Sequence, residues 1–97
     1  MPTGILVPND EPDLAAFAGR VESLGYDSLW CGELWERDAF VALARAVERT
    51  DEIGLGTAIA NVYSRTPAAL AQAAATLESA AEGRIRLGLG TSTRKAI

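Results

Sequence analysis

Short apolar segments alternate with longer helical patterns along the chain, and few folds accommodate this order. The apolar segments are typical of buried strands and cover residues 4–7, 28–31, 53–60 and 85–89. Between them lie amphipathic or alanine-rich stretches that predict helices over residues 14–24, 40–47 and 67–82. The order β-α-β-α-β-α-β implies parallel strands that are joined by right-handed crossovers.

Capping residues mark the limits of these helices. Asp38 can cap the second helix, and Thr66 followed by Pro67 is a strong start for the third. Gly25 and Gly83 follow the first and third helices, where a left-handed residue commonly ends a helix. The boundaries therefore agree with the hydrophobic pattern.

The first two helices each have an apolar face that we expect to be buried. In the first helix this face consists of Leu14, Phe17, Ala18, Val21 and Leu24. In the second helix it consists of Phe40, Val41, Ala44 and Val47. Gly54 and Gly56, in the third strand, are interpreted as small residues that let a helix pack closely.

Two α/β architectures fit this order: a doubly wound open sheet and part of a (β/α)8 barrel. A doubly wound nucleotide-binding sheet would need a glycine loop after the first strand, but residues 8–12 read Pro-Asn-Asp-Glu-Pro. A complete barrel takes about 250 residues, and this chain has 97. We therefore expect residues 1–97 to form one partial domain, the N-terminal half of a (β/α)8 TIM-type barrel with strands one to four.

Composition excludes several classes of function. The net charge of −4 argues against a nucleic-acid or anionic-membrane partner. The chain has no histidine and a single cysteine, Cys31, so we expect no metal site and no disulfide. No apolar run approaches the roughly 18 residues of a membrane helix, and the N-terminus lacks a secretory pattern. A cytoplasmic location is expected.

Polar residues follow the strands at the end where α/β folds place their chemistry. Glu33 is the best catalytic candidate, because it is a carboxylate just past an apolar strand; a solvated loop acid is the competing interpretation. Asn61 and Arg65 follow the third strand, and we expect Arg65 to pair with a neighbouring acid.

The fourth strand ends in Gly88-Leu89-Gly90-Thr91-Ser92, a segment that could hold a phosphate through backbone N–H groups and hydroxyls. The segment lacks the third glycine of a dinucleotide fingerprint and the lysine of a P-loop. Without other evidence it is a weak signal.

Three segments together resemble the luciferase-like oxidoreductases. They are residues 22–30, residues 55–67 with the helix behind them, and residues 83–92, and they cover most of the chain in the family's order. The chain looks most similar to the branch that uses coenzyme F-420, the 8-hydroxy-5-deazaflavin, as in methylenetetrahydromethanopterin reductase-like proteins. FMN is the alternative cofactor, because both branches share these motifs.

The resemblance also implies roles for individual residues. Ala58 and Ile59 fall where the family has a bulge in strand three, often with a non-prolyl cis peptide behind the central ring of the cofactor. Asn61 would lie beside that ring, and Thr91 and Ser92 would contact the cofactor phosphate.

The second strand is followed by a departure from the family pattern. Glu33 falls at an acid position near the ring, but Leu34 replaces the histidine that often follows it. Any acid–base role for this loop therefore lacks the usual proton donor.

Two hypotheses of function follow. In the first, the chain belongs to an oxidoreductase or monooxygenase that carries out hydride or oxygen chemistry on a small organic substrate. In the second, it is a truncated, catalytically inactive half-barrel that self-associates or is a gene remnant. An unpaired strand edge favours association, so we expect a homo-oligomer, in which two halves could close on each other.

Overall fold

The computed structural model describes residues 2–33 and 37–91. Four strands alternate with three helices, as the sequence predicts. The strands are β1 (Gly4–Leu6), β2 (Ser28–Cys31), β3 (Gly54–Asn61) and β4 (Ile85–Gly90). The helices are α1 (Leu14–Ser23), α2 (Ala39–Val47) and α3 (Pro67–Ala80).

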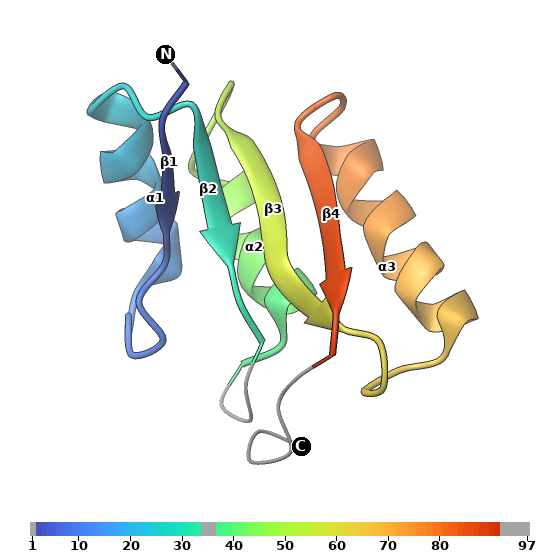
Figure 1. Cartoon of the computed structure of the whole chain (residues 1–97). Coiled ribbons are helices and arrows are strands. Elements are labelled where there is room, and N and C mark those ends of the chain that lie inside the picture. Colours follow the sequence, from blue (N-terminus) through green and yellow to red (C-terminus); the bar gives the residue numbers. More distant parts are fainter. Residues whose placement is uncertain (1, 34–36, 92–97) are drawn as a thin grey trace.

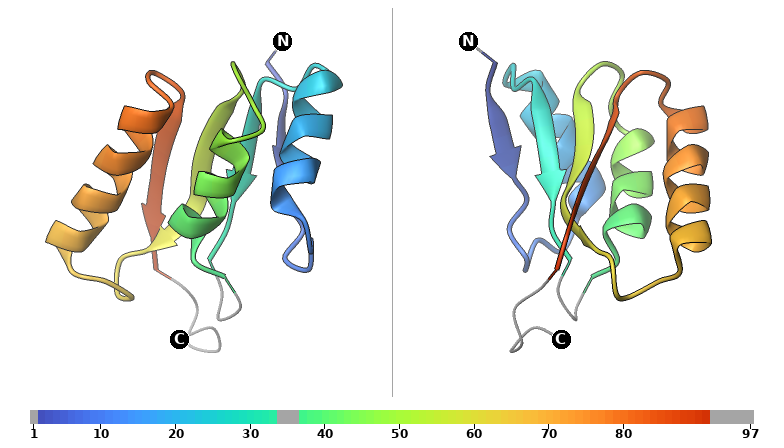
Figure 2. Two further views of the ribbon diagram at one scale, coloured as in Figure 1. Left: turned by 180° about the vertical axis from the view of Figure 1, so that it is seen from behind. Right: turned by 45° about the vertical axis from the view of Figure 1, so that its right-hand side comes forward.

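The strands form one parallel sheet in the order β1-β2-β3-β4, so each strand pairs with the next one in the sequence. All three helices cover the same face of this sheet (Figure 1). In the two other views, no helix lies on the opposite face (Figure 2). Sequential parallel strands with helices on one side are the arrangement of a (β/α)8 barrel wall. A doubly wound sheet carries helices on both faces.

The predicted caps are confirmed. The Asp38 carboxylate accepts hydrogen bonds from the first turn of α2, and the Thr66 hydroxyl accepts one from the Ala69 N–H at 3.1 Å. Gly25 and Gly83 have φ angles of +90° and +77°, as expected for residues that end a helix. Helix α3 stops at Ala80, two residues before the predicted end, because Ala81 has already left the helical conformation.

Helix α2 buries a face that matches the predicted one only in part: Phe40 is buried and Val47 packs against the core as predicted, but Ala44 is exposed. The buried side chains are Ala39, Phe40, Leu43 and Ala46, whereas Val41 is 66% exposed. The error in phase arose because the predicted set left out Ala39 and Leu43. Leu24 was also wrongly assigned to a buried face: it lies beyond the last turn of α1 and is 76% exposed.

The core lies between the helices and the covered face of the sheet. Leu29 in β2, Leu43 in α2 and Leu55 in β3 are fully buried there. Burial of apolar side chains in this core is the main driving force for folding.

Trp30 and Arg86 lie on the helix-free face and together explain the two glycines Gly54 and Gly56 of β3. A Cβ atom built on Gly56 would lie 2.5 Å from the Trp30 ring, and one on Gly54 would collide with the Arg86 guanidinium. The interpretation that these glycines admit a helix is therefore wrong. They leave room for long side chains on the opposite face of the sheet.

Candidate functional site

The carboxyl ends of the strands meet at one edge of the sheet, at the bottom of Figure 1. The structure brings Glu33, after β2, together with Asn61, at the end of β3. Thr91 directly follows β4, whose last residue, Gly90, pairs with Asn61. Ser92 and Leu34 lie outside the described residues.

Glu33 is a buried carboxylate, with 9% of the residue exposed. Its Oε1 accepts hydrogen bonds from the Asn61 N–H at 2.9 Å and from Arg65 Nη1 at 2.8 Å. Its Oε2 accepts hydrogen bonds from the Ala39 N–H at 2.9 Å and from Arg65 Nη2 at 2.6 Å. The side chain therefore connects the end of β2 with the end of β3 and the start of α2.

The prediction that Arg65 pairs with a neighbouring acid is confirmed, and Arg65 pairs with two acidic residues. Besides Glu33, its Nη2 donates to Asp38 Oδ2 at 2.7 Å. Its guanidinium carbon also lies 4.8 Å from the centre of the Phe40 ring, within the range of a cation–π contact. The sequence identified Asp38 only as a helix cap; the approach of Asp38 to Arg65 depends on how the loops fold together.

These contacts determine the charge state of the cluster. Burial by itself raises the pKa of Glu33, but hydrogen bonds from Arg65 and from two backbone N–H groups outweigh burial and leave the pKa below its ordinary value. For Asp38, burial opposes hydrogen bonds from Val41 N–H and Arg65, and its pKa is also lowered. The hydrogen bond to Glu33 raises the pKa of Arg65 further. All three groups are therefore charged at neutral pH.

Strand β3 contains the predicted bulge. The peptide bond between Ala58 and Ile59 is cis, and the pairing with β4 shifts register between Thr57 and Ala60. Thr57 was not singled out from the sequence. Its hydroxyl donates to the Gly88 carbonyl at 2.8 Å and accepts from the Gly88 N–H at 2.9 Å, so a side chain satisfies the backbone of β4 at the bulge.

Glycines allow the neighbouring strands to come close to the bulge. A Cβ atom on Gly32 would lie 3.0 Å from the Ala58 carbonyl oxygen, and one on Gly90 would lie 2.9 Å from Ile59 Cδ1. Ala58 is exposed and Ile59 is half-buried. Together they give this edge of the sheet a small apolar surface.

Asn61 links the Glu33 cluster to the turn before α3. Its N–H donates to Glu33, and its Oδ1 accepts from the Tyr63 N–H at 2.8 Å, which shapes the turn before α3. Asn61 is only 8% exposed, whereas Tyr63 is 72% exposed.

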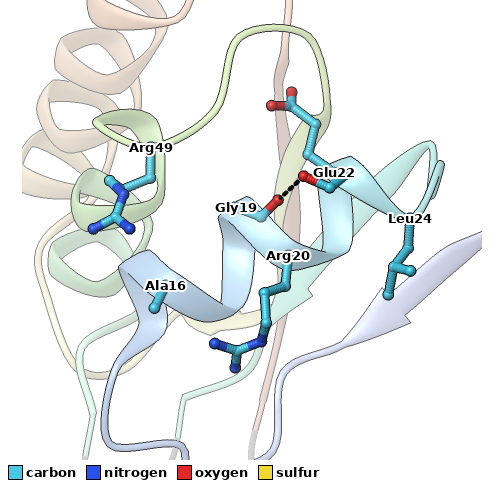
Figure 3. Close-up of a pocket in the computed structure, with 7 residues that line it drawn as sticks. Ala16, Gly19, Arg20, Glu22, Leu24 and Arg49 are labelled. Carbon is cyan, nitrogen blue, oxygen red and sulfur yellow. Dashed lines mark hydrogen bonds between the residues drawn. The ribbon is translucent and has the colours of Figure 1, made fainter.

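A surface hollow elsewhere in the molecule shares no residue with this edge. It is lined by residues of α1, by Leu24 just after that helix and by Arg49, and is shown in Figure 3. Within residues 2–33 and 37–91, no group of three or more acidic, cysteine or histidine residues could hold a metal ion. None of the helices in this part of the chain is long and apolar enough to cross a membrane.

The family model of luciferase-like monooxygenases matches residues 3–97, nearly the whole chain. The chain belongs to this family. The family assignment agrees with the arrangement of strands and with the bulge in β3.

The chain is similar to two proteins of the luciferase-like family that are named for coenzyme F-420. It is 38% identical over 89 residues to Rv3520c of Mycobacterium tuberculosis, a protein named as a candidate coenzyme F-420-dependent oxidoreductase. The match covers 92% of this chain and 25% of that protein. The coenzyme F-420-dependent tetrahydromethanopterin reductase of Methanopyrus kandleri superposes with a TM-score of 0.88 at 28% identity, over 98% of this chain and 28% of that chain.

A third protein shares only the fold at a lower identity. It is the oxygenating constituent of 3,6-diketocamphane monooxygenase from Pseudomonas putida, solved in complex with FMN. It superposes with a TM-score of 0.84 at 23% identity, over 96% of this chain and 30% of that chain. The chain thus spans about a quarter to a third of the length of the relatives it matches.

Proposed function

We propose that this chain forms part of a cytoplasmic oxidoreductase that binds coenzyme F-420 at the carboxyl edge of the sheet and acts on a small organic substrate. The observation that carries the proposal is the bulge at Ala58 and Ile59, which presents a small apolar surface at that edge. The relative from M. tuberculosis and the reductase from M. kandleri, both named for F-420, support this choice of cofactor.

Bound there, a deazaflavin would supply the hydride chemistry, so the protein would need few catalytic groups of its own. Ala58 and Ile59 would support the ring, and Asn61 would border it. Thr91 and Ser92 would hold the phosphate through hydroxyl and backbone N–H groups. Glu33 belongs to the same edge through its hydrogen bond to Asn61.

Optical titration of the protein with F-420 and with FMN tests this proposal. We expect saturable binding of F-420 with a shift of its absorption band. Binding of FMN alone would transfer the proposal to the flavin branch, for which the FMN complex from P. putida is the structural parallel. Failure to bind either cofactor, in the isolated chain and in any longer protein that contains it, would contradict the proposal.

The two edge strands of the sheet, β1 and β4, support a second candidate, a half-barrel that self-associates without enzymatic activity. Leu6, on β1, is 61% exposed, and Leu87 and Leu89, on β4, are 43% and 48% exposed. Exposed apolar side chains on edge strands favour association. Light scattering of the isolated chain tests this candidate, which a monomer with a single cooperative melting transition would contradict.

A further inference from the structure

Glu33 has no acceptor position left for a proton or a substrate. An ionised carboxylate offers about four lone-pair sites. Here the Asn61 and Ala39 N–H groups and two nitrogens of Arg65 each donate to one of its oxygens. To take up a proton, Glu33 would have to give up one of these bonds inside a site from which water is largely excluded.

The hydrogen bond to Asn61 lies where β3 no longer pairs with β2. The ladder between β2 and β3 ends at the pair Cys31 and Thr57, before the bulge. Beyond the bulge, the pairing of β3 with β4 resumes at Ala60. Glu33 therefore connects the end of β2 to the end of β3 after their backbone ladder has stopped.

The same carboxylate holds a third segment. Its Oε2 accepts from the Ala39 N–H at the start of α2, and Arg65 connects it to Asp38, the cap of that helix. Displacement of Glu33 would thus release the end of β3 from both β2 and α2.

We propose that Glu33 is a positioning residue: it fixes the carboxyl end of β3, with Asn61 and the Ala58–Ile59 peptide, against β2, and it carries no proton in the reaction. This inference rests on the proposed function, because the position of these residues matters only if a cofactor lies against them.

The substitution Glu33→Gln tests the proposal in the chain as it stands. Glutamine keeps the size of the side chain but has one acceptor oxygen in place of two, so at least one of its backbone contacts must weaken. We expect the backbone amide NMR signals of Asn61 and Ala39 to move. Glu48→Gln is the matched control, because Glu48 is exposed at the end of α2 and should leave both signals unchanged.

Cofactor binding gives the second readout. At a temperature where both proteins are folded by circular dichroism, we expect Glu33→Gln to weaken F-420 binding about tenfold or more and to alter the absorption band of the bound cofactor. An acid–base role predicts the opposite pattern, with unchanged affinity and spectrum and a loss of turnover only. Unchanged affinity and spectrum would overturn the proposal.

Arg65→Lys keeps the proposal testable if Glu33→Gln does not fold. Lysine keeps a positive charge beside Glu33 and leaves both backbone hydrogen bonds in place. We expect the Asn61 amide signal to keep its wild-type position. We expect the affinity for F-420 to stay within about threefold of the wild-type value. If Arg65→Lys lowers the affinity about tenfold or more while the Asn61 amide signal keeps its wild-type position, the proposal that Glu33 acts by positioning Asn61 is overturned. If wild type binds no cofactor, the proposed function fails, and the NMR signals alone decide whether Glu33 holds Asn61.

Discussion

Glu33 and Arg65 form a two-pronged ion pair, with Nη1 2.8 Å from Oε1 and Nη2 2.6 Å from Oε2. Their side chains are only 6% and 14% exposed. Paired, parallel N–H···O bonds of this kind are stronger and more directional than a single contact. The pair therefore stabilises the loops that follow β2 and β3 as one unit.

Removal of the arginine should be costly. We expect Arg65→Met to lower the free energy of unfolding by about 2 to 4 kcal/mol, because it leaves the buried Glu33 charge without its partner. Urea denaturation at pH 7 measures the change. Arg45→Met is the control: its pair with Asp13 has both side chains 58% exposed and should contribute less than about 0.5 kcal/mol. Equal losses in the two variants would show that burial of the pair is unimportant.

The same cluster predicts sensitivity to acid. The pKa values of Glu33 and Asp38 are lowered in the folded protein, so the unfolded chain takes up protons first as the pH falls. Their contribution to stability should be complete above about pH 5, because ordinary carboxyl pKa values lie near 4. It should be lost as the pH falls through the lowered values.

Urea denaturation between pH 3 and pH 7 measures this dependence. Glu33→Gln should flatten the decline at acid pH, because one of the groups responsible is then absent. Glu48→Gln serves again as the control and should keep the wild-type decline. A decline that is the same in wild type and Glu33→Gln would contradict the assignment.

The bulge in β3 should tolerate no side chain at position 88. A Cβ atom on Gly88 would collide with the Thr57 carbonyl oxygen, which belongs to the backbone and cannot turn aside. We expect Gly88→Ala to cost about 1 to 3 kcal/mol, measured by thermal denaturation. Gly19→Ala is the contrasting variant. Gly19 lies in the middle of α1, and a Cβ atom there would lie 3.6 Å from the Arg49 carbonyl oxygen, which is an ordinary contact. Because alanine favours a helix more than glycine does, Gly19→Ala should stabilise the protein by about 0.5 to 1 kcal/mol.

Glu22 holds the turn before β3 in a way that the sequence did not indicate. Its carboxylate accepts from the N–H groups of Asp51, Glu52 and Ile53, at distances between 2.7 and 3.1 Å. We expect Glu22→Ala to cost about 1 to 2 kcal/mol and to speed hydrogen exchange at Ile53, since these donors lose their acceptor. If exchange at Ile53 is unchanged, the hydrogen bonds are not maintained in solution.

Sequence reasoning predicted the element order and most boundaries because their signals are local. Asp38 and Thr66 each cap a helix by accepting hydrogen bonds from N–H groups within three residues. Gly25 and Gly83 end their helices through their own positive φ angles. The bulge at Ala58 and Ile59 came from the family resemblance and is confirmed by the register shift. The functional roles of Glu33, Asn61 and Thr91 stay predictions.

The order of helices and strands along the chain and the limits of the helices follow from local periodicity and capping, since each depends on residues within a turn or two of one another. The order of the strands within the sheet was decided by the tertiary structure, because the hydrophobic pattern fits both a doubly wound sheet and a barrel. The partners of Glu33, Glu22 and Trp30 depended on the tertiary structure. Glu33 meets Arg65 across 32 residues of sequence, and Glu22 meets Ile53 across 31. Such pairs form only when the crossovers bring the same edge of each strand together, and no pattern along the chain specifies which charge will meet which backbone group.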